Sequence, residues 1–372
     1  MLGCAIGKHL PGQGGGRMWQ QNRIVGTGLF ALDVILGADS RRLGSALGGS
    51  TGNVLSILGA LGWTATPVAS FGQDIAGERL CNELQSIGAD LRFVDRSSAQ
   101  RTNVIYQHQL PTSRNGSATH RFSFACPCCG EKHHPVVEFD GSIVSKALEG
   151  QAQTDVFYLD RPTRAGYELA KSYHESGALV VFEPSSAGDD PELFEAILHH
   201  AHIVKYADER FKALSCDMPS SVLAEIQTLG ASGLRFRSAA TGRAWRQLSA
   251  FAVPQVEDTS GAGDWCTAGL VYALLQRCSR TWHDLRELEL EHALAFGQAL
   301  SSLNCLTRGA RGLLKILTPA EILSLAWELC ADRANQQGLL GAKQFGKLTQ
   351  QKAQTLTLEG HDAPQVCCSA KS

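Results

Sequence analysis

Short apolar runs alternate with helix-like stretches from residue 151 onward. Residues 156–159 (Val-Phe-Tyr-Leu) and 179–182 (Leu-Val-Val-Phe) are apolar at every position, which is typical of strands buried on both faces of a parallel sheet. Further runs at residues 202–205 and 226–229 continue the series, and helical patterns separate most of the runs. This alternation predicts a three-layer α/β/α sandwich, in which helices cover both faces of a mainly parallel central sheet.

The N-terminal half starts with a similar strand and helix. Residues 23–28 predict a short strand, and residues 53–61 place Val54, Ile57 and Leu61 on one helical face. The sheet is therefore expected to begin near residue 22.

Three segments are expected along the chain. Residues 1–21 mix glycine with polar residues and predict a loose extension. Residues 22–325 are expected to form one large domain. A small β lid is expected within it at residues 33–45 and 91–140, because the second stretch carries strand-like pieces and a polar loop without a clear helix. Residues 326–372 become polar and predict a weakly ordered tail.

Charge and cysteine content restrict the setting and the partners of the protein. The formal net charge is −2, so no global basic field would hold nucleic acid or an anionic membrane. The apolar runs are much shorter than the ~20 residues needed to cross a bilayer. The chain starts with a glycine-rich stretch instead of a basic region and an apolar run. For its twelve cysteines, we therefore expect a reduced, cytoplasmic setting.

The most informative run is Glu-Asp-Thr-Ser-Gly-Ala-Gly-Asp at residues 257–264, followed at once by an apolar, helix-like stretch. Without side chains at Gly261 and Gly263 the backbone can approach a ligand, and the N–H groups of a first helical turn form an anion site. Asp264 would repel an anion, so we expect it to accept a proton from a hydroxyl nucleophile. The alternative is a tight turn in which Asp264 only benefits from the helix dipole.

This run resembles the Asp-Thr-x-Gly-Ala-Gly-Asp signature of the PfkB family of carbohydrate kinases, which have a ribokinase-like fold. The resemblance implies that Gly261, Ala262 and Gly263 form an anion hole and that Asp264 is the catalytic base. It also implies that ATP, with Mg²⁺, donates the phosphoryl group. The match extends over about residues 23–317, most of the chain.

A second stretch resembles the motif that lines the substrate pocket in this family. It is Gly-Gly-Ser-Thr-Gly-Asn-Val, from Gly48, at the start of the predicted helix. By position, Gly48 and Gly49 would let a sugar approach the backbone, Asn53 would bond to ring hydroxyls and Asp33 would accept from two sugar hydroxyls. Taken singly, Gly-Gly is also a common turn, and Asp33 could be a helix or turn cap.

The nucleotide side of the site is expected from two weaker matches. Thr228, Gly230 and Gly233 fit the Thr-Leu-Gly-x-x-Gly turn of the family, where the chain passes the nucleotide. Asn304 falls in a late segment that would line the adenine by the same resemblance. A strand followed by a glycine turn is the plainer interpretation of the first match.

The chain departs from the family at its metal motif. Many members carry Asn-x-x-Glu, which organises Mg²⁺ near the phosphates, and here Ala207 stands at the Asn position and Arg210 at the Glu position. Mg²⁺ would then be held by phosphates, water and Asp208 or Glu209. The alternative is that these two acidic residues form a solvated helix start.

The predicted lid contains the run Cys-Pro-Cys-Cys-Gly from Cys126. Cys126 and Cys129 have the spacing of a zinc knuckle, and His133 would be a third ligand, although no second cysteine pair follows at the normal spacing. Reduced cysteines on a lid loop are the alternative to a zinc site. The lid also carries positive side chains that either bind an anionic group of the substrate or are solvated surface. These side chains are Arg101, Arg114, His120 and Arg121.

These motifs predict an ATP-dependent kinase that phosphorylates a hydroxyl group of a small molecule, namely a sugar, a sugar derivative or a nucleoside. The alternative is a non-catalytic member of the family that senses a metabolite or binds a protein, which the missing Asn-x-x-Glu motif favours. A dinucleotide-binding oxidoreductase ranks last, because no Gly-x-Gly-x-x-Gly follows the first strand. Lids often pair between subunits in this family, which implies a homodimer.

Overall fold

The computed structural model describes most of the chain between residues 21 and 334. The described residues are 21–37, 39, 41–98, 100–109, 120–132, 141–150, 154–212, 214, 218–239, 242–253, 256–277, 282 and 285–334. The extension expected at residues 1–21, apart from Gln21, and the part of the expected tail after residue 334 lie outside these residues.

Among the described residues, the central sheet has eight strands in the order β14-β13-β12-β11-β10-β9-β1-β4. Neighbours from β4 to β12 pair in parallel, and β13 and β14 are antiparallel at one edge. The strands are β1 (Arg23–Thr27), β4 (Thr64–Pro67), β9 (Val156–Leu159), β10 (Leu179–Phe182), β11 (Ile203–Ala207), β12 (Ala224–Thr228), β13 (Leu234–Ser238) and β14 (Arg246–Leu248). The prediction of a mainly parallel sheet is confirmed.

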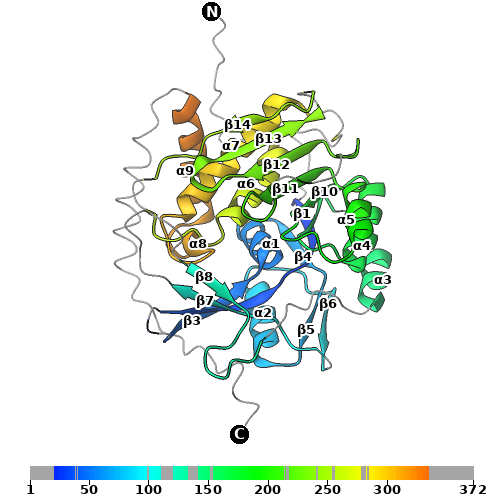
Figure 1. The fold of residues 1–372 in the computed structure, drawn as a ribbon, viewed down its shortest axis with the longest axis vertical. Helices are drawn as coiled ribbons and strands as arrows, with labels where there is room; N and C mark the ends of the chain where they lie inside the picture. Colours follow the sequence, from blue (N-terminus) through cyan, green and yellow to red (C-terminus); the bar gives the residue numbers. More distant parts are fainter. Residues whose placement is uncertain are drawn as a thin grey trace, which may run out of the picture.

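Helices cover both faces of this sheet (Figure 1). On one face lie α3 (Gly141–Glu149), α4 (Arg164–Glu175) and α5 (Pro191–Leu198), and their apolar side chains form one core with alternate residues of the strands. The helices of the other face share a second core with the opposite side of the sheet. They are α1 (Ser50–Ala60), α6 (Ala262–Arg277), α7 (Glu287–Asn304), α8 (Gly312–Ile316) and α9 (Pro319–Ala334). Strands β9 and β10 contribute to both cores, so their side chains are fully buried.

A smaller sheet of four strands forms the lid, in the order β3-β2-β7-β8 among the described residues. It consists of β2 (Ala31–Leu36), β3 (Arg42–Gly48), β7 (Val104–Gln109) and β8 (His120–Ser123), with α2 (Ile75–Ser86) packed against β2 and β3. Strand β6 (Val94–Ser97) lies inside the predicted lid segment but pairs with β5 (Ala69–Gly72) in a separate two-stranded sheet. The two predicted lid segments meet where β2 pairs with β7, and the second one joins this sheet only from β7 onward.

Two predicted boundaries differ from the structure. Helix α1 begins at Ser50, three residues earlier than expected. Helix α9 continues to Ala334, and Ala326 is fully buried in the core, so the domain boundary drawn at residue 325 falls inside a packed helix.

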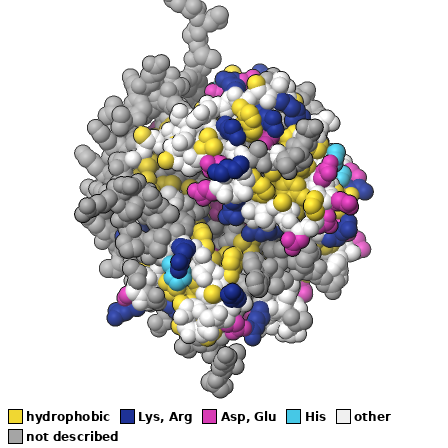
Figure 2. Space-filling model, viewed as in Figure 1, with side chains coloured by type: hydrophobic (Ala, Val, Ile, Leu, Met, Phe, Trp, Pro, Cys, Tyr) yellow, Lys and Arg dark blue, Asp and Glu magenta, His cyan; other side chains and the backbone are white. Residues whose placement is uncertain are grey.

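The surface of the described residues carries both charge signs. Figure 2 shows Lys and Arg intermixed with Asp and Glu on one face, which agrees with a net charge of −2. In the described part of the chain, no helix combines the length and the apolar character needed to span a bilayer.

Candidate functional site

The carboxyl ends of three parallel strands meet the start of a helix at one edge of the sheet. Neighbours β9, β10 and β11 all end at this edge because they run in parallel. The start of α6 lies against it, since Lys205 Nζ on β11 donates to the backbone oxygen of Gly263 at 3.2 Å. Ligands bind at this edge in open α/β sheets.

The glycine loop, residues 258–264, leads into α6 and is held from inside. Asp258 Oδ1 accepts from Ser260 N (2.9 Å) and Ser260 Oγ (2.7 Å), and Asp258 Oδ2 accepts from Gly309 N (2.9 Å). Gly261 has φ of 72°, and a Cβ there would lie 2.4 Å from the Ala310 carbonyl oxygen. Only glycine fits this turn. The loop is therefore held by contacts from within the protein.

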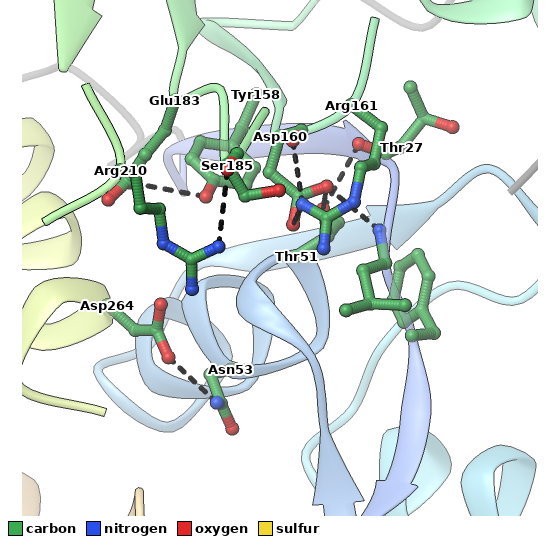
Figure 3. A network of polar contacts seen from close by, with 12 residues as sticks. Thr27, Thr51, Asn53, Tyr158, Asp160, Arg161, Glu183, Ser185, Arg210 and Asp264 are labelled. Atoms are coloured by element: carbon green, nitrogen blue, oxygen red, sulfur yellow. Dashed lines mark hydrogen bonds and ion pairs between the residues drawn. The ribbon is translucent and has the colours of Figure 1, made fainter. Parts of the chain in front are cut away.

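Asp264 lies in the first turn of α6 and contacts α1 across the site. Its Oδ2 accepts from Asn53 Nδ2 at 2.8 Å, as Figure 3 shows. Burial raises the pKa of Asp264 well above its ordinary value, and the charges of Glu183 and Asp160 add to this, while Asn53 and Lys205 oppose it. A carboxylate of raised pKa binds a proton more readily, which suits a general base.

Asn53 has one polar atom left over for a ligand. The residue is 5% exposed, and its Nδ2 is used by Asp264. Its Oδ1 is buried and has no hydrogen-bond partner among the described residues. A buried acceptor without a partner is costly, so a donor such as a hydroxyl group would be stabilised at this position.

A buried ion pair lies directly behind the glycine loop. Lys205 is 1% exposed, and its Nζ contacts Glu183 Oε1 at 2.5 Å. Glu183 Oε2 accepts from Thr267 Oγ1 on α6 (2.6 Å) and from the Tyr158 hydroxyl (3.2 Å). Burial opposes the charge on Lys205, but Glu183 and Asp264 raise its pKa. Lys205 and Glu183 therefore place a buried ion pair behind the start of α6.

Asp33, Gly48, Gly49 and Asn53 come together where the lid meets the core. Asp33 on β2 stands opposite Ala46 on β3. A Cβ at Gly48 would lie 2.0 Å from Asp33 Oδ2, so Gly48 makes room for this carboxylate. Gly49 precedes α1 with φ of 80° and carries the chain from the lid into the helix.

A second buried carboxylate, which the sequence motifs did not single out, lies beside this junction. Asp160 follows β9 and is fully buried; its Oδ1 accepts from Leu29 N (2.8 Å) and Thr51 Oγ1 (3.0 Å). Its Oδ2 pairs with Arg161 Nη1 at 3.1 Å. Burial raises the pKa of Asp160, and Arg161 and the two hydrogen bonds oppose the shift. Figure 3 shows both side chains facing the same space as Asn53 and Asp264.

One contact joins the lid to the glycine loop. Gln107 on β7 is 3% exposed, and its Nε2 donates to Ser260 Oγ at 2.8 Å. Because Ser260 Oγ donates in turn to Asp258, the lid strand and the loop share one chain of hydrogen bonds. The sequence carried no signal for this contact, since a glutamine in a strand is common on a solvated face.

The predicted nucleotide residues differ in their environment. Thr228 ends β12, and Gly230 and Gly233 form the tight turn into β13, with Leu229 N donating to Gly233 O (2.8 Å). This turn lies at the same sheet edge as Ala207, which pairs with Thr228. Asn304, expected beside adenine, is fully buried and donates from Nδ2 to the Ser260 carbonyl (3.0 Å). In this structure Asn304 supports the glycine loop instead of facing open space.

The acidic residues predicted for the metal stand in a turn after β11. Asp208 is partly exposed and Glu209 exposed. Arg210 donates from Nη1 to the Ser185 carbonyl at 3.3 Å and, in Figure 3, points into the space above Asp264. Within the described ranges, no group of three or more His, Cys, Asp or Glu side chains is arranged to hold a metal ion.

The positive residues and cysteines of the lid are only partly described. Arg101 pairs with Glu131 at 2.8 Å on the surface, which favours the solvated alternative for this arginine. Arg121 is exposed. Cys126 and Cys129 lie in a hairpin after β8, whereas Arg114, His133 and the side chain of His120 lie outside the described residues.

Asp160 and Glu183 share a signal that could have identified them. Each is a carboxylate directly after a run of four apolar residues that forms a central parallel strand. Polar side chains at such strand ends project into the ligand-binding edge of the sheet. Lys205 offered no comparable signal, because it lies within a strand and its partner comes from another one.

Comparisons with known proteins agree with this geometry. A model of the pfkB family carbohydrate kinases matches residues 25–316. Ribokinase from Giardia lamblia aligns with TM-score 0.64 and 15% identity over 83% of this chain and 99% of its own. Fructokinase with bound ATP from Xylella fastidiosa aligns with TM-score 0.62 and 19% identity over 83% of this chain and 99% of its own. Aminoimidazole riboside kinase from Salmonella enterica, complexed with aminoimidazole riboside and an ATP analog, aligns with TM-score 0.61 and 20% identity over 82% of this chain and 100% of its own. Curated protein sequences yield no significant match.

Proposed function

Because the chain belongs to the pfkB family of carbohydrate kinases, we propose that it transfers the γ-phosphoryl group of ATP to a hydroxyl group of a sugar, a sugar derivative or a nucleoside. The observation that carries the proposal is the position of Asp264. Its carboxylate has a raised pKa, lies in the first turn of α6 beside the glycine loop, and touches Asn53. The proposed base, Asp264, thus lies next to the backbone N–H groups that would bind the phosphoryl group.

The residues of the chain divide the reaction between them. Asn53 Oδ1, Asp33 and the backbone at Gly49 hold the acceptor hydroxyls. Asp264 takes the proton of the attacking hydroxyl, and the backbone N–H groups at Gly261, Ala262 and Gly263 stabilise the phosphoryl oxygens. Lys205 adds a positive charge behind these groups. The lid covers the site and keeps water, a competing acceptor, away from the phosphoryl group.

We assign the nucleotide to the edge formed by Thr228, Gly230 and Gly233, with Asn304 supporting the loop that the phosphates approach. A divalent cation, Mg²⁺ in our proposal, would offset the charge of the triphosphate. The donor set on the protein is small, since only Asp208 or Glu209 is available in the turn after β11. Phosphate oxygens and water would complete the shell, as is common for Mg²⁺.

The similar kinases suggest the class of acceptor. Those named above are a fructokinase, a ribokinase and an aminoimidazole riboside kinase, so their acceptors are a free sugar or a ribosyl compound. In this chain the buried Asp160 and the partly buried Arg161 and Asp33 place charged groups on the acceptor side. A polyhydroxyl acceptor fits Asp33 in particular, because a carboxylate can accept from two hydroxyls, whereas the oxygens of Asp160 already have partners within the protein.

A non-catalytic scaffold is the second candidate. The observation that favours it is the replacement of the family's metal motif by Ala207 and Arg210. Such a protein would retain the fold and bind a metabolite or another protein without turning over ATP.

The deciding experiment measures ADP release with Mg·ATP across a panel of sugars, sugar phosphates and nucleosides. We expect one acceptor class to support turnover, and Asp264→Asn to lower kcat by about 10²–10⁴-fold, the usual range for a general base. Asp190→Asn is the matched control, because Asp190 also starts a helix, α5, but lies outside the site. If no acceptor supports turnover and calorimetry detects no ATP binding, the scaffold replaces the kinase.

We also propose a homodimer through the lid and a cytoplasmic location. At the two edges of the lid sheet, Leu43 on β3 is 40% exposed and Phe122 on β8 is 49% exposed, and exposed edge strands are sites of pairing. The described cysteines form no disulfide, which agrees with a reducing compartment. Light scattering that gives the mass of one chain would remove the dimer.

A further inference from the structure

A hairpin of the lid carries two cysteines that the proposed reaction does not use. Residues 125–132 fold back on themselves after β8, with Ala125 and Lys132 paired in an antiparallel bridge. Cys126 N donates to Glu131 O (2.8 Å), and Gly130 N donates to Cys126 O (2.9 Å). Gly130 has φ of 71°, which closes the turn. Cys126 therefore lies at the start of a tight loop and Cys129 at its far side.

The two sulfur atoms face each other inside this loop. Cys126 is 2% exposed, and its Sγ accepts from the backbone N–H groups of Cys129 and Cys128 and contacts the Cys129 thiol and the Tyr106 hydroxyl. Hydrogen bonds from backbone amides to sulfur favour the thiolate, which is the form that binds metals.

Cys128 in the same loop has a different environment. Its side chain is exposed, and its sulfur lies 4.0 Å from Arg42 Nη2 on β3, away from the facing pair. The loop therefore separates its three cysteines into a facing pair, Cys126 and Cys129, and a third that points elsewhere. This division is what a ligand pair for one ion requires and is not expected of cysteines scattered on a surface loop.

Cys126 anchors one end of the hairpin in the core, whereas the side beyond β8 is exposed. Strand β8 has four residues, and Phe122 and Phe124 beside the hairpin remain 49% and 37% exposed. On this side the ion pair of Arg101 with Glu131 lies at the surface, where such pairs contribute little. A bound metal ion would add stabilisation here, because its binding free energy adds to folding.

We propose that Cys126 and Cys129 bind a zinc ion that fixes the hairpin to the edge of the lid. Zinc in structural sites takes four ligands, so this thiolate pair is half of the coordination shell. His133 and His134 follow in the sequence but lie outside the described residues. The site does not depend on the proposed phosphoryl transfer, since it lies in the lid and its readout is metal content.

The test measures zinc by mass spectrometry in the full-length protein, purified without chelators and dialysed against metal-free buffer. We expect one zinc ion per chain in the native protein and in Cys128→Ser, the matched control from the same loop. We expect Cys126→Ser and Cys129→Ser each to lose most of the metal. Equal loss from Cys128→Ser, or no zinc in the native protein even after incubation with zinc, would overturn the proposal.

A second measurement does not depend on whether the variants fold. Cobalt(II) added to the native, metal-stripped chain is expected to give sulfur-to-metal charge-transfer absorption that added zinc abolishes. Absence of this absorption would contradict the site. The remaining alternative is a disulfide between Cys126 and Cys129, which intact-mass analysis detects as a loss of two hydrogens. Finding the native chain in that form without metal would also overturn the zinc site.

Discussion

Asp264 owes its proposed strength as a base to its neighbours. Burial is the main reason that its pKa is raised, and the Glu183 carboxylate is the largest charge acting in the same direction. Lys205 opposes this shift but is shared with Glu183, which it contacts directly. The basicity of Asp264 is therefore controlled by a residue that does not touch the acceptor.

Glu183→Gln is expected to move the pH dependence of the reaction. Removing the negative charge leaves Lys205 without its counter-ion, so both effects lower the pKa of Asp264. Because the base must be unprotonated, the acidic limb of the kcat/KM profile should shift to lower pH. Thr267→Val is the control, since it removes a hydrogen bond to Glu183 but keeps the charge. An unmoved acidic limb in Glu183→Gln would show that Glu183 does not tune the base.

At the scale of elements, a hydrogen bond joins a strand of the lid to the glycine loop of the proposed site. Gln107 on β7 donates a hydrogen bond to Ser260 in the glycine loop. Through Ser260 it reaches Asp258, which orients the loop. One chain of hydrogen bonds therefore runs from the lid strand to the loop that forms the proposed anion site.

Gln107→Ala is expected to lower kcat by about two- to tenfold, because one neutral hydrogen bond contributes about 0.5–1.5 kcal/mol. Gln227→Ala is the control for truncating a buried glutamine, since Gln227 lies on β12 and bonds to Phe211 and Lys212. Both variants should lower the melting temperature, but only Gln107→Ala should lower kcat. Equal activity of the two variants would restrict Gln107 to a structural role.

The elements that could be predicted from the sequence are those whose burial is visible in it. Strands β9 and β10 are apolar at every position because helices cover both faces, so their existence and their place in a parallel sheet followed from pattern alone. Strand β6 (Val-Asp-Arg-Ser) has no such pattern, and only the structure shows that it pairs with β5. The polar residues of α9 conceal that Ile322 and Ala326 are buried, which explains why the predicted domain ended at residue 325, inside this helix.

At the scale of the whole molecule, the site depends on contacts that local sequence cannot show. Asn53 and Asp264 are 211 positions apart and hydrogen-bonded, and they were found only because each belongs to a recognisable family motif. Lys205, Glu183 and Gln107 belong to no such motif, and their roles follow from which strands become neighbours. The sequence thus predicted the groups proposed to act on the substrate better than the groups that position and tune them.

The buried carboxylates also connect the site to the stability of the fold. Asp264 and Asp160 both have raised pKa values in the folded chain, so the native state binds protons more tightly than the unfolded state. The free energy of unfolding therefore falls as pH rises from the ordinary carboxyl value of 3.8 through the raised values. At neutral pH, ionisation of these carboxylates therefore lowers the free energy of unfolding.

Asp264→Asn should therefore unfold at a higher urea concentration than the native chain at pH 7, although its kcat is lowered. The amide keeps an oxygen that can accept from Asn53 but carries no charge to be buried beside Glu183. Below about pH 4 both chains have a neutral side chain at this position, and their midpoints should converge. Urea unfolding of both proteins at several pH values measures the difference. If Asp264→Asn were less stable than the native chain at every pH, the carboxylate would be contributing to the fold, and the raised pKa that makes it a base would be wrong.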